Sequence, residues 1–124
     1  MTTRTLVRLS AAIEAATGVA LIVVPDLVAR LLLGAELSGS GIAVARVAGI
    51  GLLSLGLACW PTAGDPTPSA VWALLAYNLL AASYLGYLRV GGGFVAFLLW
   101  PACVLHALLA LLLGWRIMRA LAER

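Results

Sequence analysis

The chain has 124 residues, of which 64% are hydrophobic and 10% are charged. An ordinary soluble domain is nearer half apolar, so this composition excludes a soluble fold and indicates one membrane domain over residues 1–124. The formal net charge is +3, and the basic residues are all arginines scattered along the chain. Because they form no aromatic-rich basic patch of the kind that binds phosphate backbones, we expect no nucleic-acid partner.

A helix needs about 20 residues to cross the apolar core of a bilayer, so the chain is long enough for four crossings with loops between them. We predict an all-α fold, a four-transmembrane-helix bundle with a short interfacial helix after the first span. The predicted spans cover residues 5–24, 41–60, 69–89 and 94–116, and the interfacial segment covers residues 26–33.

The first predicted span carries a carboxylate, Glu14, near its middle. An ionised side chain in hydrocarbon is costly, so it normally faces the bundle interior and has a partner; a protonated, neutral Glu14 is the alternative. The preceding Arg4 and Arg8 match the start of a secretory signal. Glu14 interrupts the apolar run, however, and no small-residue cleavage pattern follows, so we expect the segment to stay.

Pro25 ends the first span, because proline lacks an amide hydrogen and disfavours helical geometry in the residue before it. The next segment, residues 26–33, opens with Asp26 and is closed by Gly34, which is typical of a short helix. It is too short to cross a bilayer. Two interpretations stay open: an interfacial helix with Arg30 reaching the headgroups, or a kinked continuation of the first span.

The second predicted span has small residues at Gly41, Ala45 and Gly49, which share one helix face. Small side chains allow another helix to approach closely, so we expect this face to be a helix contact and a candidate dimerisation surface. Arg46 lies inside the same span. Its side chain either reaches the nearer membrane surface or turns inward to a carboxylate.

The third predicted span follows a proline-rich loop, residues 61–69. Trp72 and Tyr87, near its two ends, suit the membrane interfaces, where aromatic residues are enriched. Tyr77 and Asn78 lie deeper and need hydrogen-bond partners.

The fourth predicted span contains Pro101, and an internal proline usually kinks a membrane helix. We expect the basic end of the chain to leave the membrane. Cys103 lies well inside this span, whereas Cys59 lies near the end of the second span. The difference in depth predicts two free, buried thiols and no disulfide.

Polar residues fall at similar depths in the predicted spans. At a helical rise of about 1.5 Å per residue, Glu14, Asn78 and His106 each lie about 13 Å from helix ends on one side of the membrane. Arg46 lies about 21 Å from that side, and its long side chain can bend back to the same level. The sequence therefore predicts a buried polar layer of Glu14, Arg46, Asn78 and His106. For Asn78 and His106 the alternative is a structural role, in which a lone polar side chain holds helices together.

The signatures of common catalytic and cofactor sites are missing from the sequence. It has one histidine, with no cysteine or carboxylate pair at metal-ligand spacing beside it, and no nucleophile elbow, phosphate loop or dinucleotide fingerprint. A haem would need a second axial ligand from another subunit, or a five-coordinate iron. We expect no enzymatic activity, no metal and no cofactor.

Arginine is more frequent beside the two termini than on the other side of the predicted membrane, which favours cytoplasmic termini by the positive-inside rule. The exclusive use of arginine, with abundant alanine, leucine and glycine, is typical of GC-rich bacterial genomes, so we expect a bacterial inner (plasma) membrane. The two sets of arginines are Arg4, Arg8, Arg116, Arg119 and Arg124, against Arg30, Arg46 and Arg89.

The stretches EAATGVALIVVPDLVARLLLGAELSG, VARVAGIGLLSLGLACWP, YNLLAASYLGYL and LLWPACVLHALLALLL together resemble a group of small bacterial four-helix integral membrane proteins of unknown function. The resemblance covers nearly the whole chain, and its more specific parts are the Pro-Asp turn and the two Trp-Pro pairs. It implies a fold and no particular activity. A membrane-embedded Glu in the first of four short helices is also similar to small multidrug-resistance transporters. The flanking residues do not match that family, and no substrate site is carried over.

We expect a non-enzymatic accessory or scaffold protein in the lipid bilayer, associating with itself or with a larger membrane complex through small-residue helix faces. The alternative is a small proton- or cation-coupled transporter that uses the polar layer, with Glu14 as the binding residue. A third hypothesis is a lipid or quinone niche between the helices, with Tyr77, Tyr84 and His106 along its wall.

Overall fold

The computed structural model describes residues 1–123, and in that range the chain is helical with no strand. Its helices are α1 (Thr3–Val23), α2 (Pro25–Leu33), α3 (Gly39–Ala58), α4 (Pro68–Val90) and α5 (Leu99–Ala122). The helices α1, α3, α4 and α5 are long and apolar enough to cross a membrane, whereas α2 is too short. The predicted all-α, four-span architecture is confirmed, and the length and composition of these helices indicate a multi-pass membrane protein.

Local sequence sets the helix ends. The Thr2 side chain caps α1 by accepting a hydrogen bond from the Thr5 amide, and Thr67 caps α4 in the same way. A proline lies in the first turn of α2 and of α4. Amide groups in the first turn have no partner within the helix, so the missing amide hydrogen of proline costs no hydrogen bond there. Gly34 ends α2 at a φ of 69°, in the left-handed region that glycine adopts without strain.

The last span begins later in the chain than predicted. Residues 94–98 form an apolar loop instead of a helical turn, and the Leu98 amide donates a hydrogen bond to the Leu31 carbonyl of α2 at 2.9 Å. Pro101 consequently lies in the first turn of α5, where it does not interrupt the helix. At its other end α5 extends beyond the predicted span, to Ala122.

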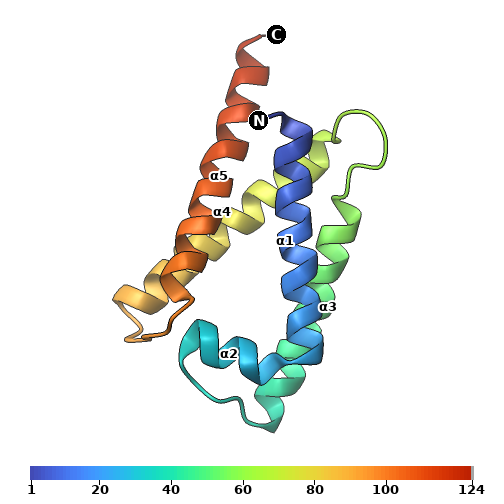
Figure 1. Cartoon of the computed structure of the whole chain (residues 1–124). Coiled ribbons are helices and arrows are strands. Elements are labelled where there is room, and N and C mark those ends of the chain that lie inside the picture. Colours follow the sequence, from blue (N-terminus) through green and yellow to red (C-terminus); the bar gives the residue numbers. More distant parts are fainter. Residues whose placement is uncertain (124) are drawn as a thin grey trace.

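The long helices form two closely packed pairs, α1 with α3 and α4 with α5 (Figure 1). Small residues line the contact between α1 and α3. A Cβ added to Gly56 would lie 2.6 Å from the Ala11 carbonyl oxygen, and one added to Gly49 would lie 2.7 Å from the Gly18 carbonyl oxygen. Because no side chain fits at either position, the two backbones touch directly.

The two pairs converge at the end of the molecule that holds both chain termini, and they separate toward the end that holds α2 (Figure 1). An apolar core from α1, α4 and α5 fills the converging end, and Leu6, Leu74 and Leu113 are almost completely buried in it. Elsewhere, many large apolar side chains on the four long helices are exposed. Such a surface is expected where helices face lipid.

Candidate functional site

A buried hydrogen-bond network next to the apolar core joins α1, α4 and α5. Asn78 of α4 is fully buried, and its Nδ2 donates to Ser10 Oγ of α1 at 2.9 Å and to the Leu74 carbonyl at 2.8 Å. Its Oδ1 lies 2.8 Å from Nδ1 of His106 in α5. Because the Leu74 carbonyl can only accept, the orientation of the Asn78 amide is fixed. One side chain therefore bonds three helices together.

Glu14 lies beside this network, one helical turn after Ser10, and its side chain is fully buried. Its Oε1 is 3.8 Å from His106 Nδ1, and in the described part of the chain no side chain forms a hydrogen bond of good geometry with either carboxylate oxygen. Tyr77 is a further neighbour of Glu14 and packs edge-on against the His106 ring, with 5.7 Å between the ring centroids. An ionised carboxylate in such apolar surroundings is costly. Within residues 1–123, the Tyr77 hydroxyl is the donor near Glu14, and no cation lies within hydrogen-bond distance of its carboxyl.

The structure brings three members of the predicted polar layer together, namely Glu14, Asn78 and His106. Arg46 is not among them. It is exposed on α3 and makes no ion pair within residues 1–123. The depth of Arg46 in the membrane favours its membership of the polar layer. However, the face of α3 that carries Gly49 and Gly56 packs on α1, and Arg46 lies outside this contact.

Ser10 belongs to the network and was not predicted from the sequence. The sequence pattern that indicates its role is its spacing from Glu14: the two residues are one helical turn apart and therefore share a helix face. A serine hydroxyl is a suitable acceptor for a buried amide, and Ser10 satisfies one of the two Nδ2 hydrogens of Asn78. It is the contact that ties α1 into the polar cluster.

The predicted helix-contact face is used only in part within the chain. Gly49 lies against α1, Ala45 is half-buried, and a Cβ on Gly41 would meet only residues just before α3. The close contact between the helices instead involves Gly49 and Gly56, which are two turns apart on α3 and pack against Gly18 and its neighbours on α1. The spacing of Gly49 and Gly56 is visible in the sequence, but Gly56 was not included in the predicted contact face.

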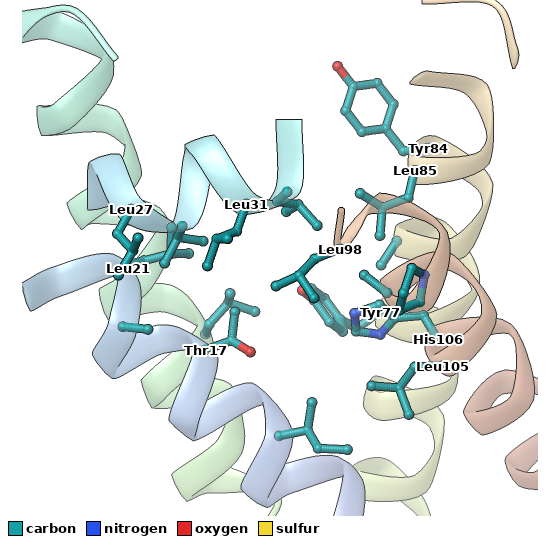
Figure 2. Close-up of a pocket in the computed structure, with 18 of the residues that line it drawn as sticks. Thr17, Leu21, Leu27, Leu31, Tyr77, Tyr84, Leu85, Leu98, Leu105 and His106 are labelled. Carbon is teal, nitrogen blue, oxygen red and sulfur yellow. The ribbon is translucent and has the colours of Figure 1, made fainter. Parts of the chain in front are cut away.

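A pocket of about 800 Å³ lies between the two helix pairs (Figure 2). It begins at the level of His106 and extends toward α2, and all five helices contribute to a wall made mostly of leucine, valine and alanine. Figure 2 shows Leu21 and Leu31 across the pocket from Leu105 and His106. The polar side chains on the wall are Thr17, Tyr77, Tyr84 and His106.

His106 and Tyr77 form the start of the pocket wall. Within residues 1–123, His106 Nε2 makes no hydrogen bond and is not among the fully buried polar atoms, and the Tyr77 hydroxyl lies close to the Glu14 carboxyl. Glu14 lies behind them and is not on the wall. We call this region, formed by Tyr77 and His106 with Glu14 and Asn78 behind them, the polar end of the pocket.

Contacts outside the spans hold α2 against the pocket. Asp26 Oδ1 accepts a hydrogen bond from the Leu37 amide at 3.0 Å, and its Oδ2 accepts one from Arg30 Nε at 2.8 Å. The Leu37 bond and the neighbouring Arg30 cation keep the pKa of the Asp26 carboxyl below its usual value. The bond between Leu98 and Leu31 fixes the other side of α2.

The side chains that commonly bind metals are dispersed. Within residues 1–123, no group of three or more His, Cys, Asp or Glu side chains lies close enough together to hold a metal ion. Cys59 and Cys103 are free thiols, as predicted, but only Cys59 is buried and Cys103 is partly exposed. The Cys103 thiol donates to the Ala82 carbonyl at 3.4 Å, which adds a contact between α5 and α4.

Comparisons of the chain with protein families, with curated proteins and with solved structures found no match. The function is therefore inferred from the pocket and its polar end.

Proposed function

We propose that this chain is a non-enzymatic membrane protein that binds an apolar molecule from the bilayer in the pocket between its two helix pairs. The observation that supports this proposal is the pocket of about 800 Å³ with its apolar wall and polar end. Small-molecule sites have this size, with mostly apolar walls and a few polar groups that orient the ligand. The pocket is open on part of its surface and lies among membrane-spanning helices, so a lipid-soluble molecule has access to it.

The test fills the pocket with a side chain. Ala81 lines the pocket, whereas Ala48 is exposed on α3 and outside it. We expect native mass spectrometry of the gently extracted wild-type protein to detect a retained apolar molecule. We expect Ala81→Trp to weaken its binding about tenfold, which corresponds to about 1.4 kcal/mol of binding free energy. Ala48→Trp is the matched control and should retain the molecule. Equal retention in both variants, or none in the wild type, contradicts the proposal.

A bacterial inner membrane with cytoplasmic termini is part of the same proposal. The two termini lie at the same end of the molecule (Figure 1), and the arginines near them in the sequence support this orientation. A fluorescent protein fused to the C-terminus should therefore fluoresce, and alkaline phosphatase fused there should be inactive; the opposite pattern reverses the orientation. The arginines are Arg4, Arg8, Arg116 and Arg119, and Arg124 lies outside the described residues.

The second candidate function is association with a larger membrane complex, and Arg46 favours it. Arg46 is exposed within a membrane-spanning helix and has no ion pair within residues 1–123. A carboxylate on a partner helix would offset the cost of this cation. We expect Arg46→Leu to lose a stoichiometric partner that Arg46→Lys retains in native mass spectra. The transporter hypothesis has less support, because Arg46 does not face the carboxylate that it was expected to balance.

A further inference from the structure

The hydrogen bonds around His106 define its tautomer. Asn78 Oδ1 can only accept, so the 2.8 Å contact with His106 requires the proton on Nδ1. Glu14 Oε1 lies 3.8 Å from Nδ1 on the same side of the ring, which is beyond hydrogen-bond distance. In the neutral imidazole, Nε2 is then left with a lone pair and no hydrogen.

This lone pair faces the pocket. Nε2 has no hydrogen-bond partner among residues 1–123 and is not fully buried, and His106 forms part of the pocket wall (Figure 2). The neighbouring Tyr77 hydroxyl can donate or accept, and the carboxyl of Glu14 lies close to it, behind both side chains. The acceptor that the polar end presents to the pocket is therefore Nε2.

We propose that the pocket selects an apolar molecule whose head donates a hydrogen bond, either a hydroxyl or an amine, and that His106 Nε2 accepts this bond. The inference rests on the proposed function. A head that can only accept, such as an ether, would leave Nε2 unpaired, and a carboxylate head would place its negative charge against the lone pair of Nε2. Asn78 is a positioning residue, because it holds the proton on Nδ1 and does not line the pocket.

The experiment uses the fact that the chain has a single histidine. Protein labelled with ring-¹⁵N histidine gives signals from His106 alone, and these report the tautomer directly. The protein is placed in phosphatidylcholine nanodiscs, since this headgroup carries no O–H or N–H donor. The probes are 1-dodecanol, dodecylamine and dodecyl methyl ether, which share a tail and differ in the head.

We expect the free protein to show a protonated Nδ1 and an unprotonated Nε2. Dodecanol and dodecylamine should shift the Nε2 signal with saturation, and the ether should leave it unchanged. The alcohol should bind about fivefold more tightly than the ether, which corresponds to one net hydrogen bond. A protonated Nε2 in the free protein, or equal or tighter binding of the ether, overturns the proposal.

A second label separates this inference from the proposed function. The methyl group of Ile13, which lines the pocket, reports occupancy independently of the histidine. If alcohol and ether shift the Ile13 methyl with equal affinity and Nε2 does not respond, the pocket binds apolar molecules and only the donor preference fails. If no probe shifts Ile13, the proposed function fails as well.

A variant tests the residue itself. In His106→Leu, the advantage of the alcohol over the ether should disappear, while the ether binds as it does to the wild type. Ether binding shows that the variant is folded and that its pocket is intact. A fivefold preference that persists in His106→Leu assigns the recognition to another side chain and overturns the role of His106.

Discussion

His106 and Asn78, on different helices and 28 positions apart in the chain, are joined by a hydrogen bond of 2.8 Å. Asn78 also donates to Ser10 of α1, so the network connects the α4–α5 pair with the α1–α3 pair where the pocket begins. The contacts that hold the helix pairs together at this point are also those that orient His106 toward the pocket.

Replacement of Asn78 by leucine should destabilise the bundle. The variant loses the bonds to Ser10 and His106, and interhelical hydrogen bonds in membranes contribute about 0.6 kcal/mol each and at most about 2 kcal/mol. We expect Asn78→Leu to lower the free energy of unfolding by about 1 to 2 kcal/mol in bicelles, measured by steric trapping. In a protein that already carries Ser10→Ala, Asn78→Leu should lower the free energy of unfolding by a smaller amount, because the hydrogen bond between Asn78 and Ser10 is already absent. Wild-type stability of Asn78→Leu contradicts this assignment.

Hydropathy was sufficient to predict the four spans, because a bilayer requires long apolar helices. It failed at the start of α5. Residues 94–98 are as apolar as a helical turn, but they form a loop whose Leu98 bonds to Leu31 of α2. This hydrogen bond is a tertiary contact between segments that are far apart in the sequence. The hydropathy of residues 94–98 alone therefore cannot reveal it.

Counting residues along each helix predicted the common depth of Glu14, Asn78 and His106, because the helical rise is nearly constant. Depth does not determine the direction in which a side chain points. The direction of Arg46 depends on which face of α3 packs on α1, and that face is set by Gly49 and Gly56. The pocket also depends on α2 lying between the separated helix pairs, which no local pattern specifies.

The glycine contact between α1 and α3 should tolerate no added methyl group. A Cβ on Gly56 would lie 2.6 Å from a backbone oxygen of α1, so Gly56→Ala forces the helices apart, and overpacking of this kind costs about 1 to 3 kcal/mol. Gly51→Ala is the matched control, because a Cβ there meets nothing within 4 Å. We expect the control to have the stability of the wild type or higher, as alanine favours helices. Equal effects of the two changes in steric-trapping measurements would refute the contact.

At acidic pH, protonation of Asp26 should weaken the contacts that hold α2 in place. The pKa of this carboxyl is lowered mainly by the bond from the Leu37 amide, with help from Arg30. A lowered pKa contributes stability above the unfolded-state value, near pH 4, and this contribution is lost as the pH falls through the folded-state value. We expect the Leu37 amide resonance to titrate below about pH 4 in the wild type and not in Asp26→Asn. Glu36→Gln should keep the transition, because the Glu36 side chain is 76% exposed and, within residues 1–123, forms an ion pair with Arg30 alone and does not contact the Leu37 amide. A transition that survives in Asp26→Asn excludes Asp26 as its source.

The loop before α5 should depend on the glycine that ends α2. Gly34 and Gly64 both have φ near 66–69°, so alanine is strained to a similar extent at either position. Only at Gly34 would the new Cβ also collide, 2.7 Å from the Val95 carbonyl oxygen, whereas at Gly64 it meets nothing within 4 Å. We expect Gly34→Ala to speed hydrogen exchange of the Leu98 amide about tenfold, since 1.4 kcal/mol of weakening corresponds to that factor. Gly64→Ala should leave this amide unchanged. The same exchange rate in both variants would show that backbone strain alone, without contact between α2 and the loop, controls this side of the pocket.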